Sequence, residues 1–162
     1  MIERIITIGA YGFDERKFID ALKAAQVDLF IDIRARRGMR GSLYAFANAR
    51  RLQTSLAQAN IRYIHIKEMA PSELVRDAQR NADAVAGIAK RDRTSLGEAF
   101  TVAYCMQCLS SFDSKHFVEV YCRNARRPVF FCVERESVAC HRSLVADRLS
   151  RDLCIPVENI NS

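Results

Sequence analysis

Cys140-His141-Arg142-Ser143 brings a thiol, an imidazole and a guanidinium together just before an apolar helical pattern. A helix that begins here would turn backbone N–H groups and the positive end of its dipole toward an anion, which Arg142 could chelate. A thiol in this position has a lowered pKa, so Cys140 is a candidate nucleophile. Alternatively, Cys140 is a buried packing residue, His141 caps or packs locally and Arg142 pairs with Glu134. Anion binding is preferred to covalent catalysis.

A basic loop from Arg34 to Ser42 is the second candidate for chemistry. It holds four arginines and two glycines, so the backbone could approach a phosphate chain while guanidinium groups bind it. These arginines are Arg34, Arg36, Arg37 and Arg40. Tyr44 and Phe46 follow, either to stack on bases or to anchor the loop. The sequence therefore predicts an anion-binding loop.

The positive charge is concentrated around this loop. Residues 33–67 contain eight basic and no acidic residues, whereas the whole chain has a net charge of only +6. Such a field attracts phosphate-bearing or other acidic partners. The alternative is a solvated helix face, since Arg50 and Arg51 fall on a predicted amphipathic helix.

The six cysteines do not predict a metal site. Cys105 and Cys108 have helical spacing on an apolar pattern, and no second well-spaced pair accompanies them. Cys122 and Cys154 are interpreted as packing residues, and reduced thiols are expected throughout. We therefore expect neither a metal nor a cofactor.

Alternating strand and helix patterns must position these groups. Strands are expected at 5–8, 27–33, 61–66, 128–134 and 157–160. Helices are expected after Asp14 and Asn48, from about residue 73 to residue 90, and along residues 100–121 and 144–153. The fold class is α/β: one domain over residues 1–162, with a mainly parallel sheet of about four or five strands. Helices are expected on both faces, with a helical insertion before the fourth strand.

Ligands bind beyond the carboxyl ends of parallel strands, so the residues that follow each strand form one predicted site. Acid, base or nucleophile roles are assigned to Cys140, Asp32 and Glu134, although Asp32 could instead orient Arg34 by an ion pair. Anion or substrate contacts are assigned to Gly9, Tyr11, Arg34, Arg36, Arg37, Arg40, Glu68, His141, Arg142 and Ser143.

Several motifs resemble the domain of unknown function 488 family. They are residues 131–135, 139–144 and 146–147, together with Thr7-Ile8-Gly9, Asp32-Ile33-Arg34, residues 38–42 and 44–46, and Glu68-Met69-Ala70-Pro71. Many members continue the first motif with His-Ser, where this chain has Ala10-Tyr11. The resemblance implies the fold and brings no settled activity, with links to DNA repair or nucleic-acid metabolism for some members.

Composition excludes a membrane protein, because no apolar run approaches the roughly 20 residues that span a bilayer. A cytoplasmic location is expected, since no signal peptide pattern begins the chain.

The sequence leaves two candidate functions. The first is an enzyme acting on a phosphorylated substrate, a nucleotide or a nucleic acid, with Arg34, Arg36 and Arg142 holding the anion. The second is a non-catalytic nucleic-acid-binding module.

Overall fold

Five short strands form one parallel sheet in the order β3-β2-β4-β1-β5. The computed structural model describes residues 1–162 apart from the side chain of Arg91. The strands are β1 (Ile5–Ile8), β2 (Leu29–Asp32), β3 (Arg62–His65), β4 (Pro128–Phe131) and β5 (Val157–Ile160). The predicted parallel α/β fold is confirmed, with five strands in the sheet.

The three inner strands are buried along their whole length, and the two edge strands are not. This difference follows from sequence, since β1, β2 and β4 are apolar or β-branched at nearly every position and so suit a sheet covered on both faces. The carboxyl ends of β1, β2 and β4 therefore meet at the centre of one sheet edge, where Asp32 and Cys132 emerge.

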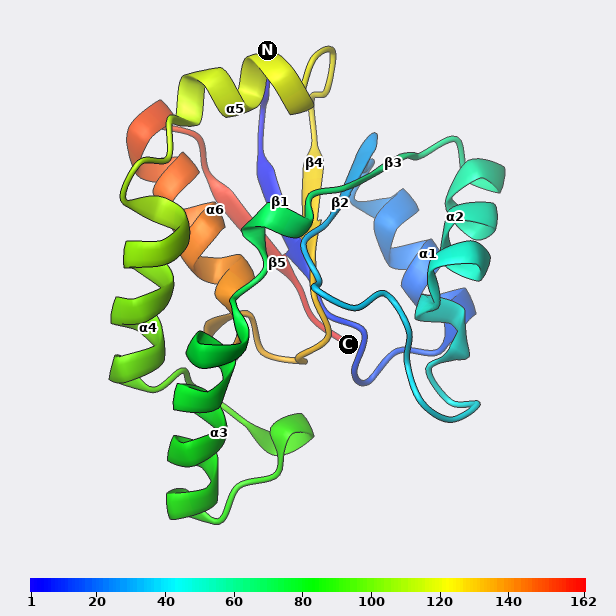
Figure 1. Cartoon of the computed structure of the whole chain (residues 1–162). Coiled ribbons are helices and arrows are strands. Elements are labelled where there is room, and N and C mark those ends of the chain that lie inside the picture. Colours follow the sequence, from blue (N-terminus) through cyan, green and yellow to red (C-terminus); the bar gives the residue numbers. More distant parts are fainter.

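Helices cover both faces, as predicted (Figure 1). One face carries α1 (Glu15–Ala24) and α2 (Ala49–Gln58), and their core contains Phe18, Leu52 and Phe131. The other face carries α4 (Glu98–Tyr104), α5 (Ser114–Tyr121) and α6 (His141–Leu153), over Ile31 and Phe130. The remaining helix, α3 (Glu73–Ala86), extends past the carboxyl ends of the strands (Figure 1).

Local signals fix where the helices begin and end. The Asp14 carboxylate accepts a hydrogen bond from the Lys17 backbone N–H at 2.8 Å and caps α1, and Phe13 packs edge-on against Phe18 as a hydrophobic staple. The helical pattern from residue 73 was expected to run to residue 90. It ends at Ala86, because Gly87 adopts a left-handed conformation with φ of 66°. The chain then turns back toward the sheet.

The expected helical insertion lies between β3 and β4 and contains α3, α4 and α5. A π-helical turn, Cys105–Leu109, continues α4. Cys105 and Cys108 lie partly buried against the core, consistent with packing roles. The insertion covers one sheet face with α4 and α5 and leaves α3 free to form a wall beyond the strand ends.

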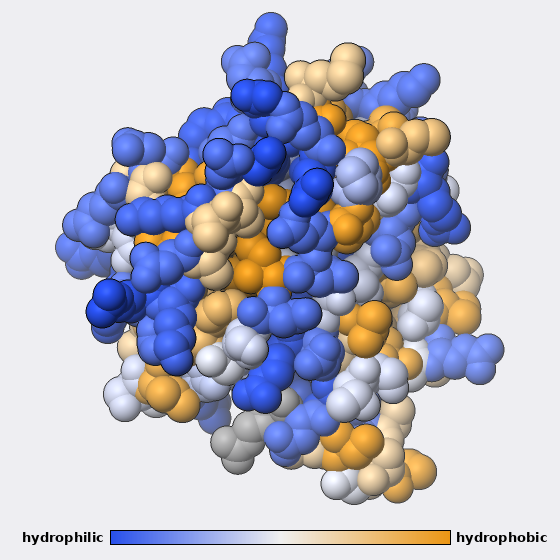
Figure 2. Space-filling view, turned by 180° about the vertical axis from the view of Figure 1, so that it is seen from behind, coloured by the Kyte–Doolittle hydropathy of each residue, from blue (hydrophilic) through white to orange (hydrophobic). Residues whose placement is uncertain are grey.

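Hydrophilic residues cover most of the molecular face opposite to that of Figure 1, with hydrophobic residues in small groups between them (Figure 2). Among the described residues, no helix has both the length and the apolar character needed to cross a bilayer.

Candidate active site

A pocket of about 770 Å³ opens between the strand ends and α3. Its lining comes from three places: the loops after β1 and β2, the segment from the end of β4 to the start of α6, and the α3 region. The members with an ionisable side chain other than tyrosine are Arg34, Arg36, Arg40, Glu73, Arg76, Arg80, Lys90, Arg93, Cys132, Glu134, Cys140 and His141. The sequence therefore brings most of the predicted strand-end residues into one cavity.

Arg34 is fixed at the pocket wall by Asp32. Its Nε and Nη2 atoms donate to the two carboxylate oxygens at 2.9 and 2.8 Å, and both side chains are buried. The Tyr63 hydroxyl also donates to Asp32, at 2.9 Å. Asp32 thus orients Arg34, the alternative to a role as a base. The Arg34 Nη1 atom is buried and has no hydrogen-bond partner among the described residues, so a donor remains for a ligand.

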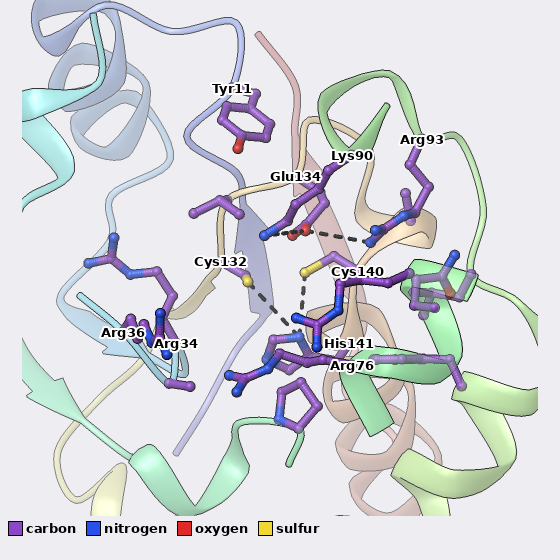
Figure 3. A pocket seen from close by; sticks show the side chains of 18 of the residues that line it. Tyr11, Arg34, Arg36, Arg76, Lys90, Arg93, Cys132, Glu134, Cys140 and His141 are labelled. Carbon is purple, nitrogen blue, oxygen red and sulfur yellow. Dashed lines mark hydrogen bonds and ion pairs between the residues drawn. The ribbon is translucent and has the colours of Figure 1, made fainter. Parts of the chain in front are cut away.

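The floor of the pocket holds two thiols and one imidazole. Cys132 follows β4, and Cys140 and His141 begin α6. The Nδ1 atom of His141 lies 3.9 Å from the Cys132 sulfur and 3.7 Å from the Cys140 sulfur. Figure 3 shows both sulfurs facing the ring, with Arg34 and Arg36 on one side and Lys90 and Arg93 on the other. Cys132, Cys140 and His141 are all buried.

The pKa values of the two thiols shift in opposite directions, because a hydrogen bond between them stabilises the thiolate of Cys140 and the protonated thiol of Cys132. Burial opposes ionisation of Cys140, but a hydrogen bond from Cys132 and the charges of His141 and Arg142 bring its pKa well below the ordinary value. The same hydrogen bond and burial raise the pKa of Cys132. Burial lowers the pKa of His141, but the Cys140 charge outweighs it and the pKa is raised. The pair thus favours one thiolate and one thiol.

Glu134 is the carboxylate beside the thiols. Its Oε1 atom lies 3.5 Å from the Lys90 ammonium and 3.6 Å from the Arg93 guanidinium, while its buried Oε2 has no partner among the described residues. Burial and the neighbouring Cys140 charge raise the pKa of Glu134. A carboxyl group with a raised pKa keeps its proton to higher pH than a free one, which suits a general acid; the role of Glu134 as acid or base stays a prediction.

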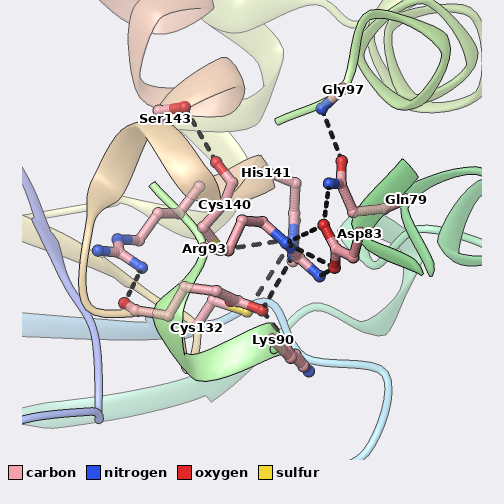
Figure 4. Close-up of polar contacts among 11 residues, drawn as sticks. Gln79, Asp83, Lys90, Arg93, Gly97, Cys132, Cys140, His141 and Ser143 are labelled. Atoms are coloured by element: carbon pink, nitrogen blue, oxygen red, sulfur yellow. Dashed lines mark hydrogen bonds and ion pairs between the residues drawn. The ribbon is translucent and has the colours of Figure 1, made fainter. Parts of the chain in front are cut away.

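Arg93 joins this floor to α3. It donates from Nε to Asp83 Oδ2 at 3.0 Å and from Nη2 to the same oxygen at 2.5 Å, in addition to its contact with Glu134. Gln79 extends the network, since its amide donates to Asp83 at 2.7 Å and its carbonyl accepts from the Gly97 N–H at 2.7 Å (Figure 4). The α3 wall is therefore held against the strand ends by buried polar contacts.

Arg142 and Gly9 lie behind the pocket and not in its lining. Arg142 is buried and donates to the backbone carbonyls of Glu134 and Arg135 at 2.7 and 2.9 Å. It shapes the loop in place of the expected contact with an anion. Gly9 is required by the same loop, because a Cβ there would lie 1.8 Å from the Glu134 carbonyl oxygen. Ser143 donates to the Cys140 carbonyl at 2.9 Å and also stays outside the lining.

Of the other predicted contacts, some face the pocket and two do not. Tyr11 lines it and packs edge-on against Tyr44 at 5.1 Å between ring centroids. Arg36 and Arg40 also line it. Arg37 instead donates to the Tyr63 hydroxyl at 3.4 Å, and Glu68 is exposed and is not among the lining residues. Most arginines of the basic loop therefore line the pocket, whereas Arg37 contacts the neighbouring strand.

Sequence reasoning missed the second basic wall, formed by Arg76, Arg80, Lys90 and Arg93. The charge count directed attention to residues 33–67 and gave no weight to cations elsewhere. The signal that was present is the helical spacing of Glu73, Arg76 and Arg80, which places all three on one face of α3. Cys132 was also not assigned to the site, although its sulfur lies only slightly farther from His141 Nδ1 than the Cys140 sulfur does, at 3.9 against 3.7 Å.

Comparison with known proteins gives a family and no activity. No curated protein and no solved structure matches the chain. The family described as "Domain of unknown function DUF488" matches residues 15–149, which include the basic loop, the α3 wall, both pocket cysteines and His141. Because this match covers most of the sequence, the chain belongs to that family.

Proposed function

We propose that the protein is an enzyme that binds a phosphate-bearing small molecule, such as a nucleotide, in this pocket. The observation that carries the proposal is the combination of seven cationic side chains in the lining with the Cys132, Cys140 and His141 group at the floor. Cations supply binding, and the thiols and imidazole supply groups able to react. The size of the pocket lies within the range of about 300–1,000 Å³ for small-molecule sites.

The cations of the pocket are only partly neutralised. Arg36, Arg40 and Arg76 line the pocket and make no ion pair among the described residues, and Arg34 has an unpartnered Nη1. Guanidinium groups match phosphate oxygens in a two-pronged geometry, so such a set favours a phosphate over a single carboxylate. The two basic walls face each other across the floor, which suits a ligand that carries its charge in the middle of the cavity.

The alternative, a non-catalytic nucleic-acid-binding module of the DNA-repair kind that the family resemblance implies, receives less support. Two arginines of the basic stretch 33–67 are engaged elsewhere: Arg51 pairs with Glu15, and Arg37 donates a hydrogen bond to Tyr63. A strand of nucleic acid needs a row of accessible cations along a surface. The cations here converge on a concave site with buried reactive groups, which favours an enzyme.

Calorimetric titration tests the binding step. Inorganic phosphate, pyrophosphate, a nucleoside diphosphate and a short single-stranded oligonucleotide are compared at low and moderate salt. We expect the small anions to bind, with affinity lost by at least tenfold in Arg36→Ala/Arg76→Ala and retained in Arg50→Ala, an exposed arginine of α2 outside the pocket. Binding of the oligonucleotide alone, with a steep loss of affinity at moderate salt, would support the nucleic-acid module instead.

Phosphorus NMR then tests for turnover of whichever small ligand binds. The signals are followed over time with wild-type protein and with Cys140→Ser. Conversion by the wild type and none by the variant is the expected result. Binding of every anion to both proteins without conversion of any would count against an enzyme and leave an anion-binding protein.

A further inference from the structure

Three potential ligand atoms meet at the pocket floor: the sulfurs of Cys132 and Cys140 and the Nδ1 atom of His141 all lie within 4.8 Å of one another. In a tetrahedral site with bond lengths near 2.3 Å to sulfur and 2.0–2.1 Å to nitrogen, sulfur and nitrogen ligands lie about 3.6 Å apart. The observed sulfur–nitrogen separations are 3.9 and 3.7 Å. A contraction of a few tenths of an ångström would therefore form such a site.

The His141 ring is oriented so that its Nδ1 atom can act as a metal ligand together with the two sulfurs. Its Nε2 atom lies 3.1 Å from the backbone carbonyl oxygen of Ile33. A carbonyl can only accept, so Nε2 carries a proton, and when a metal ion displaces any proton on Nδ1 the ring lone pair there faces the two sulfurs. Metal-bound histidines usually donate their second ring N–H in this way, which fixes the tautomer and the ring orientation.

We propose that Cys132, Cys140 and His141 bind one thiophilic divalent metal ion, for which Zn²⁺ is the best match. Two thiolates and one imidazole are zinc ligands, and three protein ligands with an open fourth position are typical of catalytic zinc. All three residues line the pocket, so the fourth position faces the cavity. This differs from the expectation of no metal drawn from the sequence.

The ion would give the proposed enzyme its reactive centre. Its open position would lie between the two basic walls, where a water molecule or a substrate oxygen could bind as a ligand. Glu134, with its unpartnered buried oxygen, lies near Cys140 and would serve as a proton acceptor. This role rests on the proposed function, whereas metal binding itself does not, because it can be measured without any anionic ligand.

Titration of metal-free, reduced protein with Co²⁺ is the first test. Wild-type protein should bind one ion and show the strong visible bands of tetrahedral cobalt together with thiolate-to-cobalt charge transfer, and Zn²⁺ should displace them. Cys132→Ser, Cys140→Ser and His141→Ala should each lose these bands. Cys105→Ser/Cys108→Ser is the matched control, since it removes the other close cysteine pair, and it should keep them.

A second measurement needs no substitution and so remains decisive if a variant does not fold. X-ray absorption of zinc-loaded wild-type protein should show two sulfur ligands at about 2.3 Å and nitrogen or oxygen ligands at about 2.0–2.1 Å. A stoichiometric ion with this ligand set supports the site. Absence of cobalt binding to the reduced protein, retention of the bands in the pocket variants, or a disulfide between Cys132 and Cys140 in protein purified without oxidant would overturn it.

The two proposals fail separately. Metal binding without any phosphate ligand would leave the metal site standing and remove the proposed substrate class. Anion binding that depends on Arg36 and Arg76 in a protein that binds no metal would do the reverse.

Discussion

Gly9 at the end of β1 lies against the backbone of Glu134, so closely that a Cβ at position 9 would lie 1.8 Å from the Glu134 carbonyl oxygen. The same carbonyl accepts a hydrogen bond from Arg142 Nη1. The end of β1, the loop after β4 and the first turn of α6 therefore meet at a single backbone oxygen.

Gly9→Ala should consequently destabilise the fold. The nearest atoms are backbone, so the loop itself must move, and overpacking of this kind costs about 1–3 kcal/mol or more. Urea denaturation measures the change. Gly38→Ala is the control, because a Cβ at Gly38 meets nothing within 4 Å. Equal stability of the two variants would contradict the close packing at position 9.

The Asp32–Arg34 pair predicts a large effect of removing one partner. Asp32→Asn leaves the buried Arg34 guanidinium without its counter-charge, which typically costs about 3–5 kcal/mol. Asp32→Asn/Arg34→Gln should recover part of this loss, because two neutral groups can hydrogen-bond without a buried charge. Asp20→Asn, in the exposed pair with Arg16, should change stability by less than about 1 kcal/mol. Additive losses in the double variant would argue against the pair.

Alkaline pH should destabilise the protein through Cys122. Burial raises the pKa of this thiol from 9.0 to about 12. Because the folded state holds the proton more tightly, the stabilisation is full below the unfolded pKa and is lost as pH rises from about 9 toward 12. Between about pH 8 and pH 10.5, wild type should lose about 2 kcal/mol more than Cys122→Ala. Urea unfolding at both pH values checks this, and parallel profiles would be inconsistent with a buried neutral thiol.

Acid pH should weaken the attachment of α3. Burial alone would raise the pKa of Asp83, but hydrogen bonds from Arg93 and Gln79 outweigh it and the pKa is lowered. A lowered pKa contributes stability above the unfolded value, near 3.8, and that stability is lost as pH falls through the folded value. Asp83→Asn should therefore be less stable than wild type at neutral pH, and the difference should shrink below about pH 4. A constant difference would exclude the ion pair as its cause.

The fold was predictable because its signals are local. Asp14 and Ser72 cap helices where the sequence places them, and the apolar strands β1, β2 and β4 occupy the buried centre of the sheet. Since parallel strands share one carboxyl edge, Cys140 and Arg34 could also be expected in one site. Gly87, whose conformation ends α3 earlier than periodicity suggested, shows where a local signal was present but overlooked.

The rest of the site depends on contacts between distant segments, which residue spacing along the chain does not predict. Whether Arg142 faces a ligand or two backbone carbonyls is decided by the loop after β4, and this loop has no periodic pattern. The position of α3 depends on where the insertion packs, so helical spacing could place Arg76 on one face of α3 but could not place that face in the pocket. Cys132 and Cys140 meet only because the chain turns back between β4 and α6.

Two facing basic walls, one from the loop after β2 and one from the α3 region, have a consequence for the empty protein. Like charges across the cavity repel, so the network of Arg93, Asp83 and Gln79 must hold α3 in place against that repulsion. A polyvalent anion would act as an electrostatic cross-link between the walls. Occupancy should then slow amide hydrogen exchange along α3 while leaving α1, on the opposite sheet face, unaffected.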